Sequence, residues 1–305
     1  MRNRFRLPAR SYSAGVTLIE LAITIALVGI LAALIVQFVA PVRSYIDSSR
    51  RAALADTADT ALRRIGRDVR LALPNSVRVA TDGSATYVEF LLVRTGGRYR
   101  YEPGAGGTDC GGTTADDVLS FGVSDTCFTS IGDVPNAADV KTTDYVVVFN
   151  LPTGTAKADA YDTTCGTVCN KALVTTQPLA AGTGGHRIDF TGGNTFTYES
   201  PGRRFFIVEG PVTYACNPSA AGGTVTRHSG YAILASLAAP PAAAPGGAGA
   251  LLASGVTGCS IKYDTSVAGQ AAGLLTMRLQ LSMQDSRGDT ENVALYHAVH
   301  VNNVP

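Results

Sequence analysis

Glu20 is the first acidic residue of the chain, and it lies at the start of a long apolar segment. Glu20 is followed by Leu21–Val36, which contains no charged residue, and the uncharged stretch continues to Val42 for 22 residues in all. A charged side chain inside a membrane helix costs about 2.5–3.5 kcal/mol on insertion scales, so it marks a function and needs a partner. We therefore expect Glu20 to have a functional role and a positively charged partner. In the alternative interpretation it only snorkels at the level of the lipid headgroups.

The small residues that precede this segment could form a cleavage site. An ordinary secretory signal has its small-residue site after the apolar stretch, whereas Ala14 and Gly15 come before it. Cleavage after Gly15 would leave the apolar helix attached to the mature chain.

All six cysteines lie in the C-terminal two thirds of the chain. An even number of cysteines fits disulfides in an oxidising compartment, although six allow 15 pairings. We expect nearest-neighbour pairs: Cys110 with Cys127, Cys165 with Cys169, and Cys216 with Cys259. A metal site at Cys165 and Cys169 is the alternative, but their spacing is not C-x-x-C and no second pair follows.

Two further clusters carry metal-ligating residue types. His297 and His300 read as H-x-x-H, but residues three apart on a strand point to opposite faces and would not converge on one ion. Asp285, Asp289 and Glu291 could hold Ca²⁺, but the EF-hand spacing is absent, and a hairpin turn is favoured. Nucleotide-binding P-loop, G-x-S-x-G and H-E-x-x-H motifs are all missing. The sequence predicts no cofactor, no metal and no catalytic residue.

A long helix is expected to present the Glu20 region. Its apolar span is about 33 Å long as a helix, enough to cross a bilayer. Apolar residues then recur at spacings of three and four, which is typical of an amphipathic helix; they are Leu54, Ala58, Ala61, Leu62, Ile65, Val69 and Leu73. We expect one helix from Val16 to Leu73, with Gly29 and Pro41 as sites for a kink. The arginines on its polar face, Arg63–Arg70, are expected to be solvated and paired with Asp59 and Asp68 rather than to bind an acidic partner.

After Val77 the apolar period changes to two, which indicates strands. We predict a hairpin of Tyr87–Val93 and Arg98–Tyr101 around the turn at 95–97. Further strands are expected at 118–121, 145–149, 187–190, 195–198, 204–208, 212–215, 224–227, 258–263, 274–282 and 293–301. The Pro/Ala/Gly-rich stretch 240–249 is expected to be a surface loop. The predicted fold class is α+β: a long N-terminal helix, membrane-spanning in its first half, and a mainly antiparallel β domain with disulfides.

Charge and orientation limit the partners. The chain has 25 basic and 24 acidic residues, so it lacks the basic excess of a nucleic-acid-binding protein. Four arginines lie within the first fifteen residues, and the positive-inside rule then places the N-terminus in the cytoplasm and the cysteine-bearing part outside.

The N-terminal features together resemble the processing site of type IV prepilins and pseudopilins. They are a short basic leader, Gly15, Glu20 five residues later, and the long apolar helix. The resemblance implies that a prepilin peptidase cuts after Gly15 and methylates Val16, where the family usually has Phe. It implies that the Glu20 carboxylate pairs with the Val16 amine of its own or a neighbouring subunit and sets the filament register.

The resemblance also implies a domain plan and partners. Residues 1–15 would be the leader, 16–42 the transmembrane and filament-core helix, 43–74 the amphipathic second half of that helix, and 75–305 the exported β-rich domain. The protein would be a single-pass inner-membrane protein with a periplasmic C-terminal domain that later joins a surface pilus. Its partners would be the prepilin peptidase, other pilins, an assembly platform and its ATPase.

Later segments are similar to minor prepilins of the mannose-sensitive haemagglutinin (MSHA) pilus: 50–56, 71–78, 200–214 and 299–305. The expected function is therefore a minor, structural pilus subunit. A J-type minor pseudopilin of a type II secretion system is the alternative. A membrane-tethered enzyme would need a cleft of convergent polar groups, and a carbohydrate-binding tip adhesin is disfavoured by the absence of Trp.

Overall fold

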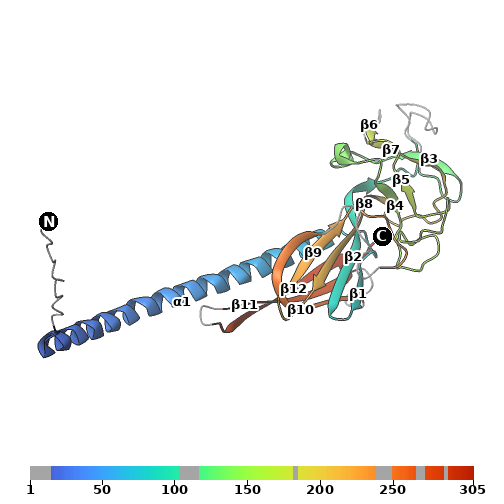
Figure 1. The fold of residues 1–305 in the computed structure, drawn as a ribbon. Coiled ribbons are helices and arrows are strands. Elements are labelled where there is room, and N and C mark those ends of the chain that lie inside the picture. Colours follow the sequence, from blue (N-terminus) through green and yellow to red (C-terminus); the bar gives the residue numbers. More distant parts are fainter. Residues whose placement is uncertain (1–14, 103–116, 181–184, 238–248, 266–271, 285–287) are drawn as a thin grey trace, which may run out of the picture.

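In the computed structural model, one long helix leads into a β-rich head (Figure 1). The structure describes residues 15–102, 117–180, 185–237, 249–265, 272–284 and 288–305, without the side chains of 38–44 and 179–180. Helix α1 spans Leu18–Arg70, 53 residues or about 80 Å. Its first part projects away from the head, and its second part lies against the sheet. The predicted α+β class with a long N-terminal helix is confirmed.

The main sheet is antiparallel throughout the described strands. Its principal order is β1-β2-β8-β9-β10-β11-β12; in addition, β4 pairs with β8, and β5 pairs with β4. The bounds are β1 Arg78–Asp82, β2 Ala85–Arg98, β4 Tyr145–Val148, β5 Lys171–Leu173, β8 Arg204–Asn217, β9 Gly223–Ser229, β10 Ala250–Asp264, β11 Ala272–Gln284 and β12 Thr290–Asn302.

Between β2 and β8 the chain builds an additional subdomain with a smaller sheet. This sheet has the order β3-β7-β6, from Asp125–Thr129, His186–Asn194 and Leu179–Ala180, and a short 3₁₀ helix, η1, covers Ala137–Asp139. Its core is aromatic, with Phe128 contacting Phe205 of β8 at a ring-centroid distance of 4.9 Å. The subdomain lies at the end of the head farthest from the start of α1 (Figure 1).

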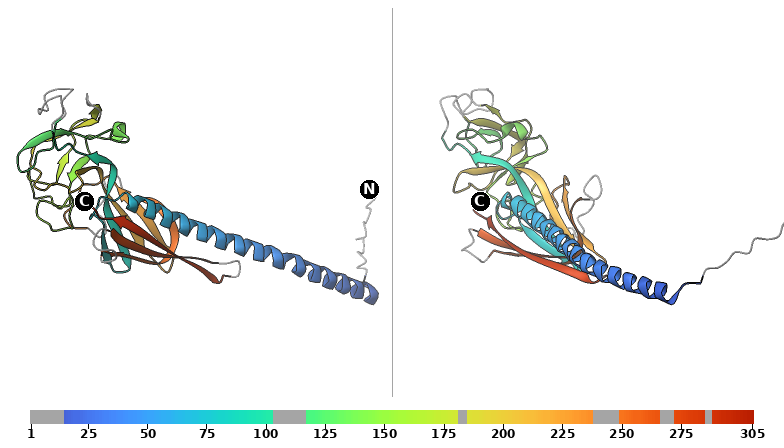
Figure 2. Two further views of the ribbon diagram at one scale, coloured as in Figure 1. Left: turned by 180° about the vertical axis from the view of Figure 1, so that it is seen from behind. Right: turned by 90° about the vertical axis from the view of Figure 1, so that its left-hand side faces the viewer.

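The main core lies between α1 and one face of the sheet (Figure 2). All seven apolar positions predicted for the amphipathic part of the helix are buried: Leu54, Ala58, Ala61, Leu62, Ile65, Val69 and Leu73. The first six meet alternate residues of the strands, such as Val299 and Val301 of β12, whereas Leu73 belongs to a neighbouring cluster. Burial of this stripe holds the helix on the head, since removing apolar surface from water is the main driving force for packing.

The helix is shorter at both ends than the sequence predicted. It begins at Leu18 because Thr17 is its N-cap, with extended backbone and a side chain that accepts the Glu20 N–H at 3.3 Å. It ends at Arg70 because the next residues pair with β2: Leu73 N–H donates to Leu91 O at 2.8 Å. The helix is continuous through Gly29 and Pro41.

The predicted hairpin at residues 87–101 is wrong. Residues 85–98 form one continuous strand, β2, that pairs with β8 through register shifts around Val93. Gly96 and Gly97 serve close packing rather than a turn, because a Cβ at Gly96 would lie 2.6 Å from Phe205 O. The real hairpin joins β1 to β2 at Gly83, whose φ of +58° is one that glycine adopts without strain.

Several other strand predictions need correction. Residues 118–121 and 195–198 are not strands, and only Phe121 and Phe196 pair, as an isolated bridge. The predicted strands 204–208 and 212–215 are two halves of β8, which passes through Pro211 without interruption. The other predicted strands are present, and β10 extends further than expected, from Ala250. Most of the predicted loop, residues 240–248, lies outside the described residues.

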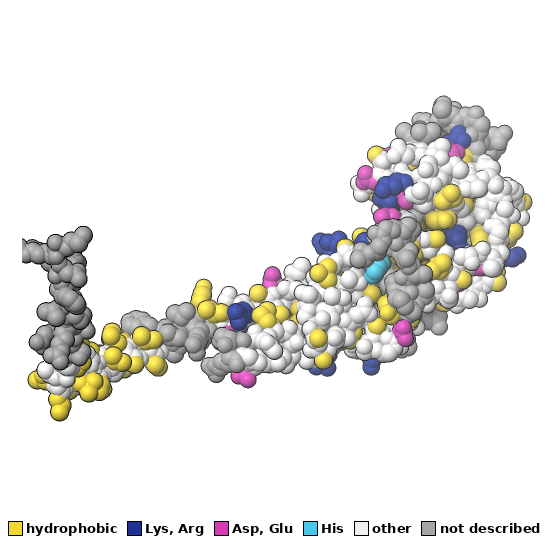
Figure 3. Space-filling view, viewed as in Figure 1, with side chains coloured by type: hydrophobic (Ala, Val, Ile, Leu, Met, Phe, Trp, Pro, Cys, Tyr) yellow, Lys and Arg dark blue, Asp and Glu magenta, His cyan; other side chains and the backbone are white. Residues whose placement is uncertain are grey.

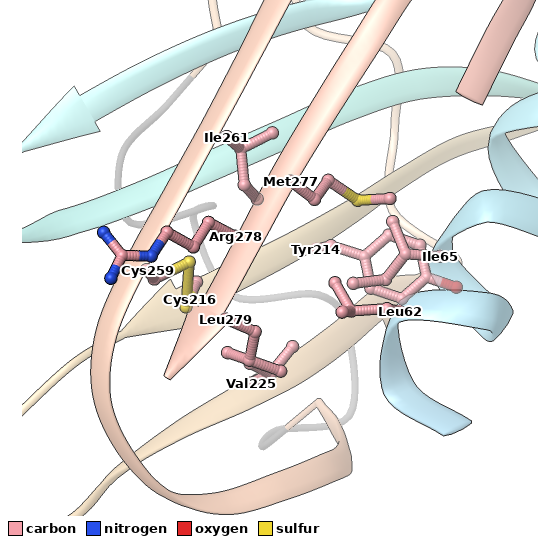
Figure 4. A pocket seen from close by; sticks show the side chains of 10 residues that line it. All are labelled: Leu62, Ile65, Tyr214, Cys216, Val225, Cys259, Ile261, Met277, Arg278 and Leu279. Atoms are coloured by element: carbon pink, nitrogen blue, oxygen red, sulfur yellow. A yellow bond between two sulfur atoms is a disulfide. The ribbon is translucent and has the colours of Figure 1, made fainter. Parts of the chain in front are cut away.

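Two disulfides join described cysteines in the pairs that the sequence analysis expected. Cys165 is bonded to Cys169, and Cys216 of β8 is bonded to Cys259 of β10, with a sequence separation of 43 for the second pair. Cys127 is also disulfide-bonded, while its expected partner Cys110 lies outside the described residues. Figure 4 shows the Cys216–Cys259 bond beside the apolar side chains that fill the space between the sheet and α1. This bond therefore links two strands of the sheet on which α1 packs.

Candidate functional site

The segment Gly15–Glu20 leads into α1 and is exposed. Gly15 and Val16 precede the helix in non-helical backbone, and Val16 is 70% exposed. A Cβ placed on Gly15 would have no atom within 4 Å. The peptide bond between Gly15 and Val16 therefore lies just outside the regular helix.

Glu20 lies in the first turn of α1. A carboxylate there is favoured by the positive end of the helix dipole. The Thr17 side chain accepts the Glu20 N–H, and the order Thr-x-x-Glu is the signature of a capping box. The sequence analysis missed this role of Thr17, although the signature is visible in the sequence. The cap fixes the first turn, which contains Glu20.

The helix that follows is apolar and uncovered. Leu18–Gln37 has a mean hydropathy of 2.7 and none of it is buried, so by length and composition it could cross a membrane. Leu18, Ile25 and Val36 are 86%, 65% and 66% exposed. In Figure 3 hydrophobic side chains cover the visible face of this arm. Apolar surface of this extent needs lipid or other helices around it.

The histidine and acidic clusters do not form a site among the described residues. His297 and His300 both lie on β12, where His297 is half-buried toward α1 and His300 is exposed. Glu291 forms an ion pair with Arg51 of α1 at 3.3 Å. Asp285 lies outside the described residues, as does Arg287. No group of three metal-ligating side chains is found in the described part of the chain.

The arginines near the end of α1 are only partly paired within the helix. Arg63 pairs with Asp59 at 2.5 Å, as expected. Asp68 does not pair with them, because it accepts hydrogen bonds from Tyr214 Oη at 2.6 Å and Arg227 Nε at 2.9 Å on the sheet. Burial, followed by the Asp68 hydrogen bond, raises the pKa of Tyr214 above its usual value. One flank of α1 is thus tied to β8 and β9, which leaves Arg64, Arg67 and Arg70 on the polar surface.

Three segments that are far apart in the sequence, 71–78, 200–214 and 299–305, meet at one junction. Asn75 N–H donates to Asn303 Oδ1 at 3.2 Å, and Ser200 Oγ donates to Pro305 O at 3.2 Å. Asn75 Nδ2 also donates to Asn150 O at 2.9 Å. These contacts attach the end of the helix to the C-terminus and to the subdomain, so the segments have a structural role.

Comparison with known proteins identifies the N-terminal segment. Residues 10–36 match the family described as the prokaryotic N-terminal methylation motif. The chain carries a type IV prepilin signal. No curated protein and no solved structure matches the chain.

The signal agrees with the geometry of the segment and supports the prepilin and pseudopilin family. It points to a structural subunit that is anchored in a membrane by one helix. It also implies processing by a prepilin peptidase and association with other pilins.

Proposed function

We propose that the protein is a minor prepilin-like subunit that takes part in the initiation and assembly of an MSHA-type type IV pilus used for surface attachment. The single observation that carries the proposal is the match of residues 10–36 to the methylation motif at the start of an exposed 20-residue apolar span. The choice of an MSHA-type system is supported by the segments 50–56, 71–78, 200–214 and 299–305, which are similar to the minor prepilin MshO.

In this proposal, Gly15 and Val16 are the site of processing, and Glu20 is the charged partner of the processed N-terminus. Prepilin peptidase hydrolyses the bond after Gly15 on the cytoplasmic side and methylates the amine of Val16. Glu20 remains in the apolar helix, where its carboxylate pairs with that positively charged amine in a neighbouring subunit. The platform protein and its ATPase then draw the helix out of the inner membrane, while the C-terminal domain stays in the periplasm and later lies on the filament surface.

The size of the head supports a minor subunit. The subdomain between β2 and β8 extends the head beyond the sheet that packs on α1. A bulky head is harder to repeat along a closely packed filament than at one end of it. We therefore place the subunit at an end of the filament rather than along its length.

A strain that lacks the gene distinguishes the pilus proposal from the type II secretion alternative. If the pilus proposal holds, we expect electron microscopy to show loss of surface pili, with normal secretion of exoproteins in the same culture and recovery of pili on complementation. Retained pili with exoproteins trapped in the periplasm would instead assign the chain to a secretion system as a J-like pseudopilin. No change in either property would contradict both assignments and favour an accessory tip adhesin or an enzyme.

A further inference from the structure

Strand β12 is a free edge of the main sheet. It pairs along its whole length with β11 in 13 consecutive residue pairs, and no other described strand pairs with it. Its side chains alternate between the α1 side, such as Val299 and Val301, and an exposed face on which Tyr296 is 67% exposed. The backbone groups on its outer side are therefore in position to pair with a further strand.

This edge lacks the features by which proteins normally protect a free strand. Such edges carry lysines, prolines or β-bulges, or they are short. Strand β12 has 13 residues, no Lys, no Pro and no break in its register with β11. Its one acidic residue, Glu291, is paired with Arg51. An edge that is long, regular and nearly uncharged favours the addition of a strand from another chain.

A basic groove borders the same strand. An open space of about 540 Å³ lies between α1 and β12, and its lining residues are Thr60, Arg63, Arg64, Gly66, Arg67, Arg70 and His297. At its floor α1 approaches β12 closely, since a Cβ on Gly66 would lie 2.9 Å from His297 Nε2. Among the described residues, Arg64, Arg67 and Arg70 have no ion-pair partner.

The helix and the strand run side by side in the same direction. Arg51 meets Glu291 near the start of β12, and Gly66 meets His297 six residues further along the strand. Arginines four apart on the helix, such as Arg63 and Arg67, are separated by about 6 Å along its axis. Alternate side chains of a strand are separated by about 6.8 Å. A strand added to β12 would thus direct every second side chain toward this row of arginines.

We propose that the β12 edge and the arginine row form a docking site for an extended, alternately acidic segment of another protein. The backbone of the segment would extend the main sheet at β12, and its Asp or Glu side chains would pair with Arg64, Arg67 and Arg70. The identification of the partner as another exported subunit of the same assembly rests on the proposed function. The docking of an acidic segment at this site does not depend on the proposed function.

The distance from the membrane argues against anionic lipid as the occupant. Arg64 lies 27 residues after Gln37, the end of the apolar span. Along a helix this is about 40 Å. Electrostatic attraction to a charged surface is screened within about 8 Å at physiological ionic strength. An acidic protein segment is therefore the occupant that fits both the charge and the free strand edge.

Binding of a synthetic peptide tests the proposal without reference to pili. The full chain in detergent micelles is titrated into the fluorescein-labelled peptide Thr-Glu-Val-Glu-Val-Glu-Val-Glu-Thr, and fluorescence anisotropy is recorded. We expect saturable binding that weakens with salt, and at least about a tenfold loss of affinity for Arg64→Glu/Arg67→Glu. The matched control, Lys141→Glu/Lys262→Glu, makes the same change in net charge at exposed lysines outside the groove and should bind like the wild type.

A second peptide separates strand addition from simple charge attraction. The same peptide N-methylated at its four central amides keeps its charge but loses the central hydrogen-bond donors on both edges, and the methyl groups obstruct strand pairing there. We expect its binding to be lost. Equal binding of the two peptides would overturn the strand addition. Equal affinity of wild type and the double arginine variant would overturn the role of the groove, and no saturable binding of the first peptide would overturn the proposal as a whole. None of these outcomes bears on the loss of pili that tests the proposed function.

Discussion

Glu20→Gln is expected to be processed normally and to enter filaments at less than about a tenth of the wild-type level. The substitution keeps the size of the side chain and removes its charge. Two unit charges 4 Å apart attract by about 4 kcal/mol at an effective dielectric constant of 20, and removing one of them leaves the Val16 amine unpaired in an apolar environment. The measurement is the ratio of this protein to the major pilin in sheared pili, by quantitative mass spectrometry.

The controls isolate the charge of Glu20 from other effects of substitution. Asp56→Asn makes the same chemical change at an exposed position of the same helix, outside the apolar span, and should leave incorporation unchanged. Glu20→Asp keeps the charge and should retain part of the incorporation. Wild-type incorporation of Glu20→Gln would refute the pairing of Glu20 with the amine.

Cys216→Ala/Cys259→Ala is expected to lower the free energy of unfolding by about 4 kcal/mol. In the chain-entropy model the cost depends on the loop that the disulfide closes, here between positions separated by 43 residues. The bond also joins β8 to β10 beside the core on which α1 packs, as Figure 4 shows. The measurement is the shift of the urea midpoint, and the slope of the transition, for the full chain in detergent.

The second described disulfide provides a matched control. Cys165→Ala/Cys169→Ala removes the same number of cysteines, but its positions are separated by only four residues, and the same model gives about 2 kcal/mol. The order of the two effects is the informative result. Equal losses, or a larger loss for the Cys165–Cys169 pair, would contradict the assignment of the Cys216–Cys259 bond as the main covalent brace of the sheet.

The parts of the fold that depend on local patterns could be predicted from the sequence. The buried stripe of α1 follows directly from apolar residues at spacings of three and four, and the predicted apolar positions from Leu54 to Val69 are buried as expected. Strands β11 and β12 show clear alternation and were placed within a few residues. The Gly15–Glu20 signal is also local, since the few residues that define it lie next to the apolar run.

The parts that depend on distant contacts could not be predicted in this way. Thr95-Gly96-Gly97 has the composition of a turn, but Gly96 is needed because Phe205, more than a hundred residues later, lies against it. Asp68 was expected to pair within its helix, but its partners Tyr214 and Arg227 are on strands that fold over it. The groove beside β12 likewise exists only because α1 lies along that strand. In each case the deciding contact joins segments that are far apart in the sequence, and no local sequence pattern predicts that they lie close together.

The intact mass and N-terminal peptide of the protein extracted from cell membranes test the central claim most directly. We expect the mature chain to begin at Val16 with one methyl group on its amine. Gly15→Leu should keep the whole leader. A Cβ at residue 15 has no atom of the described chain beyond its neighbours within 4 Å, so this failure would report on the peptidase rather than on folding. Ala14→Ser, the neighbouring small-residue control, should be cleaved like the wild type. A wild-type chain that retains residues 1–15, or one cut elsewhere, would contradict the assignment of this protein as a processed prepilin.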